Sequence, residues 1–248
     1  MQVVQWMKQI SRMKQFTWIK WLCLSSAIGI FLVACSSAPQ GPSYISGGTL
    51  SERLKDYDLE QGDEVLIRIF KEEGMLELWM KPKNSREFRH FANYPICNFS
   101  GILGPKMYEG DLQSPEGFYR VYRSSLNPHS RFYKSFNLGY PNNFDRSLGR
   151  TGSYLMVHGK CDSVGCYAMT DAQIDEIYRL VEMALQNGQS YVEVQAYPFK
   201  MTPERLERAK HSIHYEFWNN LHEGYEQFEA RKQPLEYSVG RGRYLFLK

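Results

Sequence analysis

The sequence predicts an α+β fold, a mainly β core followed by helices on its C-terminal side. Short apolar or aromatic runs, separated by Gly, Pro and Asn, recur between residues 65 and 157. This spacing is typical of an all-β core rather than of alternating βαβ units. Two helical patterns then begin near Thr170 and Pro203. The chain is long enough for one domain with a sizeable core.

The first segment has the order of a secretory signal, with basic residues before an apolar run from Trp21 to Ala34. A membrane-spanning helix needs about 20 apolar residues, so the run is too short for one. It ends in Leu-Val-Ala-Cys35, which is similar to a bacterial lipobox. We therefore expect residues 1–34 to be a lipoprotein signal peptide and Cys35 to be lipidated. A plain secretory signal for soluble export is the alternative, although it would not need this cysteine.

Residues 35–62 are expected to form the lipidated N-terminus and a flexible tether. The stretch from Ser36 to Gly48 is rich in Ser, Pro and Gly and has no periodicity. Several acyl chains on Cys35 would anchor the protein stably. Because serine rather than aspartate follows the cysteine, the sorting habit of Gram-negative lipoproteins suggests the periplasmic face of the outer membrane.

Net charge gives no reason to expect a nucleic-acid partner. The formal charge is +3, and loss of the four basic residues of the signal takes it to about −1. No basic stripe and no internal repeat stands out.

The domain is expected to span residues 63–248 and to open with a β-hairpin. VLIRIF and MLELWM, within Val65 to Met80, alternate around a glycine-containing turn. The glycine-rich segment 101–117 lacks the spacing of a nucleotide-binding loop and indicates hairpin turns, so no cofactor is expected. Further strands are predicted over Arg86–Cys97, Phe118–Tyr122 and Phe132–Leu138.

The candidate catalytic residues follow the end of the next predicted strand. The apolar run from Tyr154 to Val157 predicts a buried strand followed by His158, and Cys166 comes eight residues later, after Gly165. A cysteine reacts as the thiolate, which a neighbouring imidazolium and N–H donors favour by lowering its pKa. The amides of Gly165 and Cys166 are candidates to bind an oxyanion. The pattern indicates a Cys/His acyl-transfer site, with the Gly159 carbonyl as the nearest partner to orient the imidazole.

Helical patterns follow this segment. Thr170 and Gln173 form a plausible capping box, the apolar face runs from Ile174 to Leu185, and Gly188 stops the helix. Residues 191–197 alternate as a strand. Thr202 and Pro203 begin a second helix that continues to Phe228, whereas residues 231–248 fit either a strand or an extended arm.

Two other interpretations of the Cys/His segment remain. A histidine at a strand end is more often structural than catalytic, and most buried cysteines are inert. Alternatively, His158, Cys161 and Cys166 would be soft metal ligands. The chain offers no fourth ligand at zinc-like spacing, so we expect no metal.

The segment HGKCDSVGCYAMTD, His158 to Asp171, resembles the catalytic signature of the L,D-transpeptidase (YkuD) family, cell-wall enzymes with a cysteine nucleophile. In that signature a His-Gly pair is followed by Ser-x-Gly-Cys. The nearest likeness is to the YafK-like branch, and it covers about residues 63–202. Supporting segments in the same order are YPICNFSGILGPK (94–106), GDLQSPEGFYRV (110–121), FNLGYPNNFDR (136–146) and GRTGSYLMVHG (149–159).

The resemblance implies an L,D-transpeptidase-like β-sandwich and assigns the site residues. Cys166 would be the nucleophile, His158 the base, and Gly159 the carbonyl that orients it. Ser163 and Gly165 would shape the loop and the oxyanion hole. Candidates for holding anionic or amide groups of the substrate are Tyr154, Lys106 and Arg146.

The implied substrate is a peptidoglycan stem peptide, attacked at diaminopimelate through a Cys acyl-enzyme. An amine acceptor would give cell-wall cross-linking or remodelling. Hydrolysis at the same site, with cleavage of cross-links or release of wall-linked lipoprotein, is the alternative. An inactive peptidoglycan-binding lipoprotein is the alternative of another class. The chain departs from the family pattern at Val164, where many members have histidine, and at Ala168, where they have arginine.

The cysteines also allow an inference about pairing. Cys23 would leave with the signal and Cys35 would take lipid, which leaves three cysteines. The periplasm is oxidising, so a nucleophile has to escape pairing. We therefore expect a disulfide between Cys97 and Cys161.

Overall fold

A computed structural model of the chain describes residues 48–247. The expected signal peptide, Cys35 and residues 36–47 of the expected tether lie outside this part. Within it, no helix has the length and apolar character needed to cross a bilayer.

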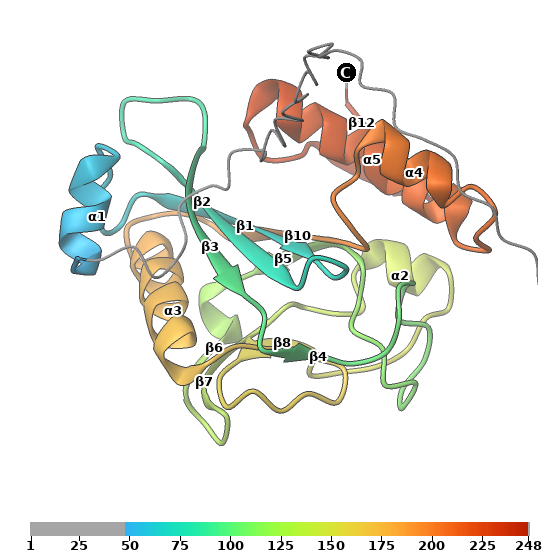
Figure 1. The fold of residues 1–248 in the computed structure, drawn as a ribbon, viewed down its shortest axis with the longest axis horizontal. Helices are drawn as coiled ribbons and strands as arrows, with labels where there is room; N and C mark the ends of the chain where they lie inside the picture. Colours follow the sequence, from blue (N-terminus) through green and yellow to red (C-terminus); the bar gives the residue numbers. More distant parts are fainter. Residues whose placement is uncertain (1–47, 248) are drawn as a thin grey trace, which may run out of the picture. The chain divides into compact units, whose positions relative to one another are not determined.

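The first of two five-stranded sheets has the order β3-β2-β1-β10-β5 (Figure 1). The hairpin expected from the alternating apolar pattern is present as β1 and β2. β10 lies parallel to β1, so the sheet is mixed rather than wholly antiparallel. The strands are β1 (Glu64–Phe70), β2 (Met75–Lys81), β3 (Arg89–Pro95), β5 (Gly117–Val121) and β10 (Val192–Tyr197).

The second sheet has the order β4-β9-β8-β7-β6 and carries the Cys/His segment. The strand expected over residues 154–157 begins later, at Met156, and includes His158. Tyr154 has a φ of 54°, which is incompatible with a strand and explains the later start. The strands are β4 (Asn98–Phe99), β6 (Leu126–Ser130), β7 (Tyr133–Asn137), β8 (Met156–His158) and β9 (Tyr167–Ala168).

The helices cover both faces of the first sheet. α3 begins after Thr170, whose hydroxyl accepts a hydrogen bond from the Gln173 amide, so the expected capping box is confirmed. The helical elements are α1 (Leu50–Asp56), η1 (Arg123–Ser125), α2 (Asn143–Ser147), α3 (Asp171–Gln186), α4 (Pro203–Arg208) and α5 (Tyr215–Arg231).

Alternate residues of β1 face two different cores. Val65 and Ile67 pack in a cluster with α3 and the second sheet, whereas Leu66 and Phe70 pack with α4 and α5. In Figure 1 the strands of the second sheet and the helices α4 and α5 accordingly lie on opposite sides of the first sheet. The family's expected β-sandwich is thus present, with a helical layer added outside it.

The expected C-terminal boundary of the tether, residue 62, lies too far along the chain. α1 occupies part of residues 35–62, and both Leu54 and Leu59 are buried in the core that contains β1. Thr49 caps α1 with a capping box closed by Glu52. The folded domain therefore includes α1, because two leucines supply enough apolar surface to hold this segment against the sheet.

The single helix expected from Pro203 to Phe228 is also wrong. α4 ends at Arg208, and the chain turns before α5 begins at Tyr215. The apolar spacing on both sides is nearly continuous, so the periodicity alone does not reveal the break. The last residues form a hairpin of β11 (Tyr237–Gly240) and β12 (Arg243–Phe246).

A buried ion pair joins the layers. Lys71 follows β1 directly, and Glu116 comes just before β5. Both side chains are fully buried, and 3.0 Å separates the Lys71 Nζ from the Glu116 Oε1. The Lys71 ammonium also donates to the carbonyls of Ile102, Gly104 and Ser114. Glu116 accepts from the Gly104 amide and, through its other oxygen, from the indole N–H of Trp218 on α5. The pair therefore fixes residues 102–116 against both the sheet and α5.

Replacing Lys71 by methionine should lower the free energy of unfolding by about 3–5 kcal/mol, because Glu116 would keep a buried charge without its partner. Urea denaturation of the two proteins measures this difference. Lys55→Met on the exposed side of α1 is the matched control and should change stability by less than about 0.5 kcal/mol. Equal stability of the two variants would contradict the role given to the pair.

Candidate active site

Strand register brings the histidine and the cysteine together. β8 and β9 are parallel neighbours in which His158 is opposite Ala168. Cys166 comes two residues before Ala168, and its sulfur accepts a hydrogen bond from the Met156 amide at 3.4 Å. Cys166 lies just before β9 rather than in it, and this contact holds its sulfur against the backbone of β8, two residues before His158.

The imidazole of His158 is oriented by the backbone. Its Nδ1 lies 2.7 Å from the Gly159 carbonyl oxygen, and its ring packs on Phe132 with the centroids 4.5 Å apart. A carbonyl only accepts hydrogen bonds, so the neutral ring carries its proton on Nδ1 and leaves Nε2 as the basic atom. Burial lowers the pKa of His158, against the opposing effects of the Gly159 carbonyl and Asp162. The ring is therefore neutral near pH 7.

The Cys166 thiol is half-buried. It donates to the Tyr154 carbonyl at 3.6 Å, while its sulfur accepts from Met156. Burial raises the pKa of Cys166, only partly offset by the Met156 amide and the charge of Lys106. An imidazolium that would lower this pKa is absent at rest, because both groups lose hydration and are neutral. Within the described residues no hydrogen bond joins the imidazole to the sulfur.

The loop between β8 and β9 requires glycine at two places. A Cβ on Gly159 would lie 2.6 Å from the Asp171 carboxylate and 2.9 Å from the Phe132 carbonyl. Gly165 has a φ of 116°, which other residues rarely adopt. The amide of Lys160 donates to the same Asp171 oxygen at 2.9 Å, so the first turn of α3 holds the loop.

Three serine hydroxyls fix the backbone around the nucleophile. Ser163 and Ser114 both donate to the Cys166 carbonyl, at 2.6 and 3.0 Å. Ser100 accepts from the Gly165 amide at 2.6 Å. The Gly165 amide is therefore occupied, whereas the amide of Cys166 has no acceptor within residues 48–247. Sequence reasoning missed Ser100 and Ser114, because nothing in their spacing connects them with partners that lie 65 and 52 residues away along the chain.

The remaining cysteines are joined to each other. Cys97 and Cys161 form a disulfide, which links the start of β4 to the loop between β8 and β9. Cys166 is the free cysteine of the described part. Cys161 is consequently not available as a thiolate ligand, and residues 48–247 contain no group of three side chains placed to hold a metal.

The three candidate substrate residues have different surroundings. Lys106 is buried, and its ammonium is 2.5 Å from the Asp111 carboxylate, so it is not free to bind a substrate directly. The Tyr154 side chain is 75% exposed. Arg146 is exposed as well and donates to the Pro141 carbonyl and to Asn143. Tyr154, Arg146 and Met156 line one cavity of about 430 Å³. The Met156 amide donates to the Cys166 sulfur, although neither Cys166 nor His158 lines this cavity.

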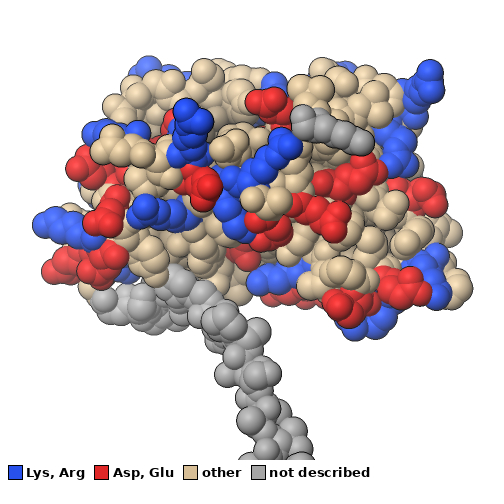
Figure 2. All heavy atoms as spheres, turned by 90° about the horizontal axis from the view of Figure 1, so that it is seen from above, with Lys and Arg blue, Asp and Glu red and all other residues tan. Residues whose placement is uncertain are grey.

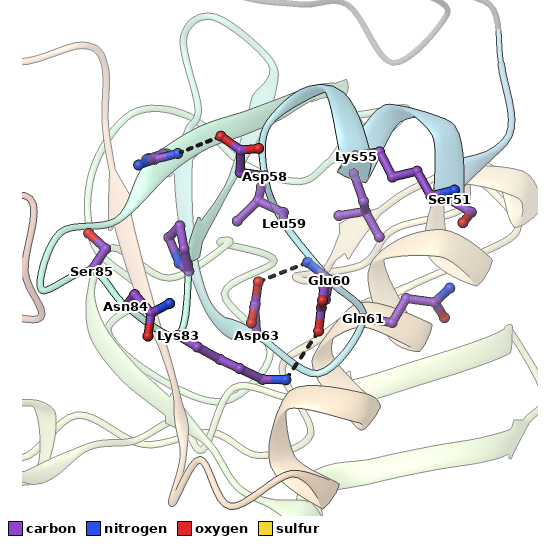
Figure 3. Close-up of a pocket in the computed structure, with 13 residues that line it drawn as sticks. Ser51, Lys55, Asp58, Leu59, Glu60, Gln61, Asp63, Lys83, Asn84 and Ser85 are labelled. Carbon is purple, nitrogen blue, oxygen red and sulfur yellow. Dashed lines mark hydrogen bonds and ion pairs between the residues drawn. The ribbon is translucent and has the colours of Figure 1, made fainter.

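A larger cavity, of about 630 Å³, lies away from this chemistry between α1 and the β2–β3 connection. Figure 3 shows two of its ion pairs, and their partners are Lys83 with Glu60 and Asp58 with Arg89. It contains neither histidine nor cysteine. We therefore place the candidate active site at Cys166.

Comparison with known proteins agrees with the resemblance seen in the sequence. The model of the L,D-transpeptidase catalytic domain (YkuD) matches residues 67–194. The YafK proteins of Escherichia coli K12 and O157:H7, both provisionally designated L,D-transpeptidases, are 47% identical over 195 residues, which is 78% of this chain and 78% of theirs.

Two solved structures are more distant. The helical cell shape determining protein Pgp2 of Campylobacter jejuni aligns with a TM-score of 0.43 and 17% identity, over 75% of this chain and 79% of its own. Bd1075 of Bdellovibrio bacteriovorus aligns with a TM-score of 0.41 and 20% identity, over 67% and 62%.

The rate of Cys166 alkylation by iodoacetamide should rise with pH. The midpoint of this rise should lie above 9.0, the ordinary pKa of a cysteine thiol. The thiolate is the reactive form, and a raised pKa leaves little of it at pH 7. Mass spectrometry of the peptide that contains Cys166 measures the rate. His158→Ala should leave the midpoint unchanged, since a neutral ring adds no charge. A rate that is already constant below pH 7 would instead indicate a thiolate–imidazolium pair.

Proposed function

The chain belongs to the L,D-transpeptidase (YkuD) family, and from this premise we propose that it is a cysteine acyltransferase acting on peptidoglycan stem peptides. The observation that supports the proposal most directly is the hydrogen bond from the Met156 amide of β8 to the sulfur of the unpaired Cys166, two residues before the backbone-oriented His158. Chemistry of this kind needs a nucleophile and a base within reach of one substrate atom.

In the proposed first step, the Cys166 sulfur attacks the carbonyl carbon of an amide at diaminopimelate. His158 Nε2 takes the thiol proton as the new C–S bond forms, so no preformed thiolate is required. The unoccupied Cys166 amide is the candidate donor to the oxyanion. The tetrahedral intermediate then expels the amine, which takes the proton from His158, and a thioester remains on Cys166.

The second step regenerates the thiol. An amine acceptor attacks the thioester carbonyl and gives its proton to His158. A new amide forms as the C–S bond breaks, and the leaving sulfur takes the proton back from His158. The product is a cross-link or a remodelled stem peptide. Water in place of the amine gives hydrolysis at the same atoms, so the products distinguish the two outcomes.

Cys166→Ala should abolish turnover, and His158→Ala should lower it by about 10²- to 10⁴-fold, the usual effect of losing a general base. Purified sacculi incubated with each protein, digested to muropeptides and weighed by mass spectrometry, give the products. New dimers indicate transpeptidation, and shortened monomers or lost dimers indicate hydrolysis. Circular dichroism checks that both variants fold. Turnover retained by Cys166→Ala would rule out this mechanism, and absence of turnover by the wild-type protein would favour the inactive wall-binding lipoprotein.

We also propose that the protein is lipid-anchored at Cys35 on the periplasmic face, at the outer membrane of a Gram-negative cell. The support is the signal-like sequence before Cys35 and the Cys97–Cys161 disulfide, since such bonds persist in oxidising compartments. An anchored enzyme would stay close to the stem peptides of the wall, which raises its effective concentration there.

Radiolabelled palmitate fed to growing cells should label the wild-type protein and not Cys35→Ser, because acylation requires the thiol. Cys23→Ser is the matched control and should label normally. Equal labelling of the Cys35→Ser protein would argue against the anchor.

A further inference from the structure

A second cavity adjoins the one lined by Tyr154, Arg146 and Met156, which we call the inner cavity. It measures about 300 Å³ and shares three lining residues with the inner cavity, namely Ser125, Gly139 and Arg146. Its far wall is the β11–β12 hairpin, which contributes Tyr237, Val239 and Tyr244. The two cavities therefore adjoin, and the cleft that they form extends from Met156, whose amide contacts the Cys166 sulfur, to the C-terminal hairpin.

The charged residues that line this cleft are all basic. Arg120 and Arg146 line the outer cavity, and Arg146 also lines the inner one, whereas neither lining contains Asp or Glu. On the face shown in Figure 2, by contrast, acidic and basic side chains are interspersed. A positively charged cleft without acidic groups favours a ligand that carries a carboxylate.

Neither guanidinium group forms an ion pair with another described residue. Arg146 donates to a carbonyl and an amide oxygen. Arg120 lies over the Tyr191 ring with 4.4 Å to its centroid and hydrogen-bonds to the side chain of Tyr122, which uses only part of its donors. Glu193, on the neighbouring strand, is in register with Arg120. Its carboxyl group is buried, however, and accepts hydrogen bonds from Gln195 and from the Leu235 amide. Arg120 therefore keeps donors for a ligand.

The outer cavity also lies partly beyond the catalytic domain shared with the family. The family match ends at residue 194, whereas the hairpin wall comes from residues 237–244. Its aromatic rings line the same cavity as the two arginines, a combination suited to a polar chain with a fixed negative charge.

We propose that the outer cavity is a subsite for a carboxylate of the wall peptide, one or two residues away from the attacked amide. This inference rests on the proposed function. Arg120 and Arg146 would bind that carboxylate, and the C-terminal hairpin would close the subsite around the chain. The cavity would thereby select stem peptides whose side carboxylate is free over those in which it is amidated.

The test uses the full-length protein carrying Cys166→Ala, so that binding is measured without reaction. Two synthetic stem tetrapeptides that contain diaminopimelate serve as probes, and they differ only in whether the glutamyl carboxylate is free or amidated. Calorimetry should find the free acid bound about fivefold more tightly, the effect of a partly exposed Arg–carboxylate contact. Adding Arg120→Gln should reduce this preference to less than about twofold.

Arg179→Gln, on the exposed face of α3, is the matched control and should keep the fivefold preference. A preference unchanged by Arg120→Gln, or equal binding of the two peptides to the parent protein, would overturn the subsite. In that case turnover of sacculi by the wild-type chain would still support the proposed function. If neither peptide binds and the wild type yields no new muropeptide, both proposals fail.

Discussion

The buried pair of Lys71 and Glu116 is the constraint on which the geometry of the site depends. A charged lysine and glutamate without solvent contact are stable only when their hydrogen-bonding groups are satisfied, and here backbone carbonyls, an amide and the Trp218 indole satisfy them. Because Ser114 belongs to the segment held in this way, its hydroxyl reaches the Cys166 carbonyl. The charge pair thus acts on the nucleophile through the backbone and one serine.

The contacts around Cys166 fix its position but do not ionise its thiol, so proton transfer has to accompany the attack on the substrate. The loop is held by Asp171, by the disulfide and by hydroxyl groups, while the sulfur and the imidazole are both neutral at rest. A neutral pair does not need a compensating charge in a half-buried pocket. Proton transfer from Cys166 to His158 then accompanies attack on the carbonyl, so the oriented Nε2 matters more than a permanently acidic thiol.

Local patterns predicted the elements whose signal is short-range. The β1–β2 hairpin, the capping box of α3 and the mainly β core followed by helices are all visible in spacing and residue type. The errors occurred where long-range packing decides. α1 folds because Leu54 and Leu59 find a core, and the break between α4 and α5 leaves almost no mark on the apolar periodicity.

The sequence by itself determined the family and the candidate nucleophile and base, because the His-Gly pair and the Ser-x-Gly-Cys group lie within one short segment, residues 158–166. Only the tertiary structure decided how those groups ionise and what supports them. Burial is a property of the packed chain, so the raised pKa of Cys166 could not be inferred from its neighbours in sequence. The cleft toward β11–β12 likewise depends on segments about 100 residues apart that meet only after folding.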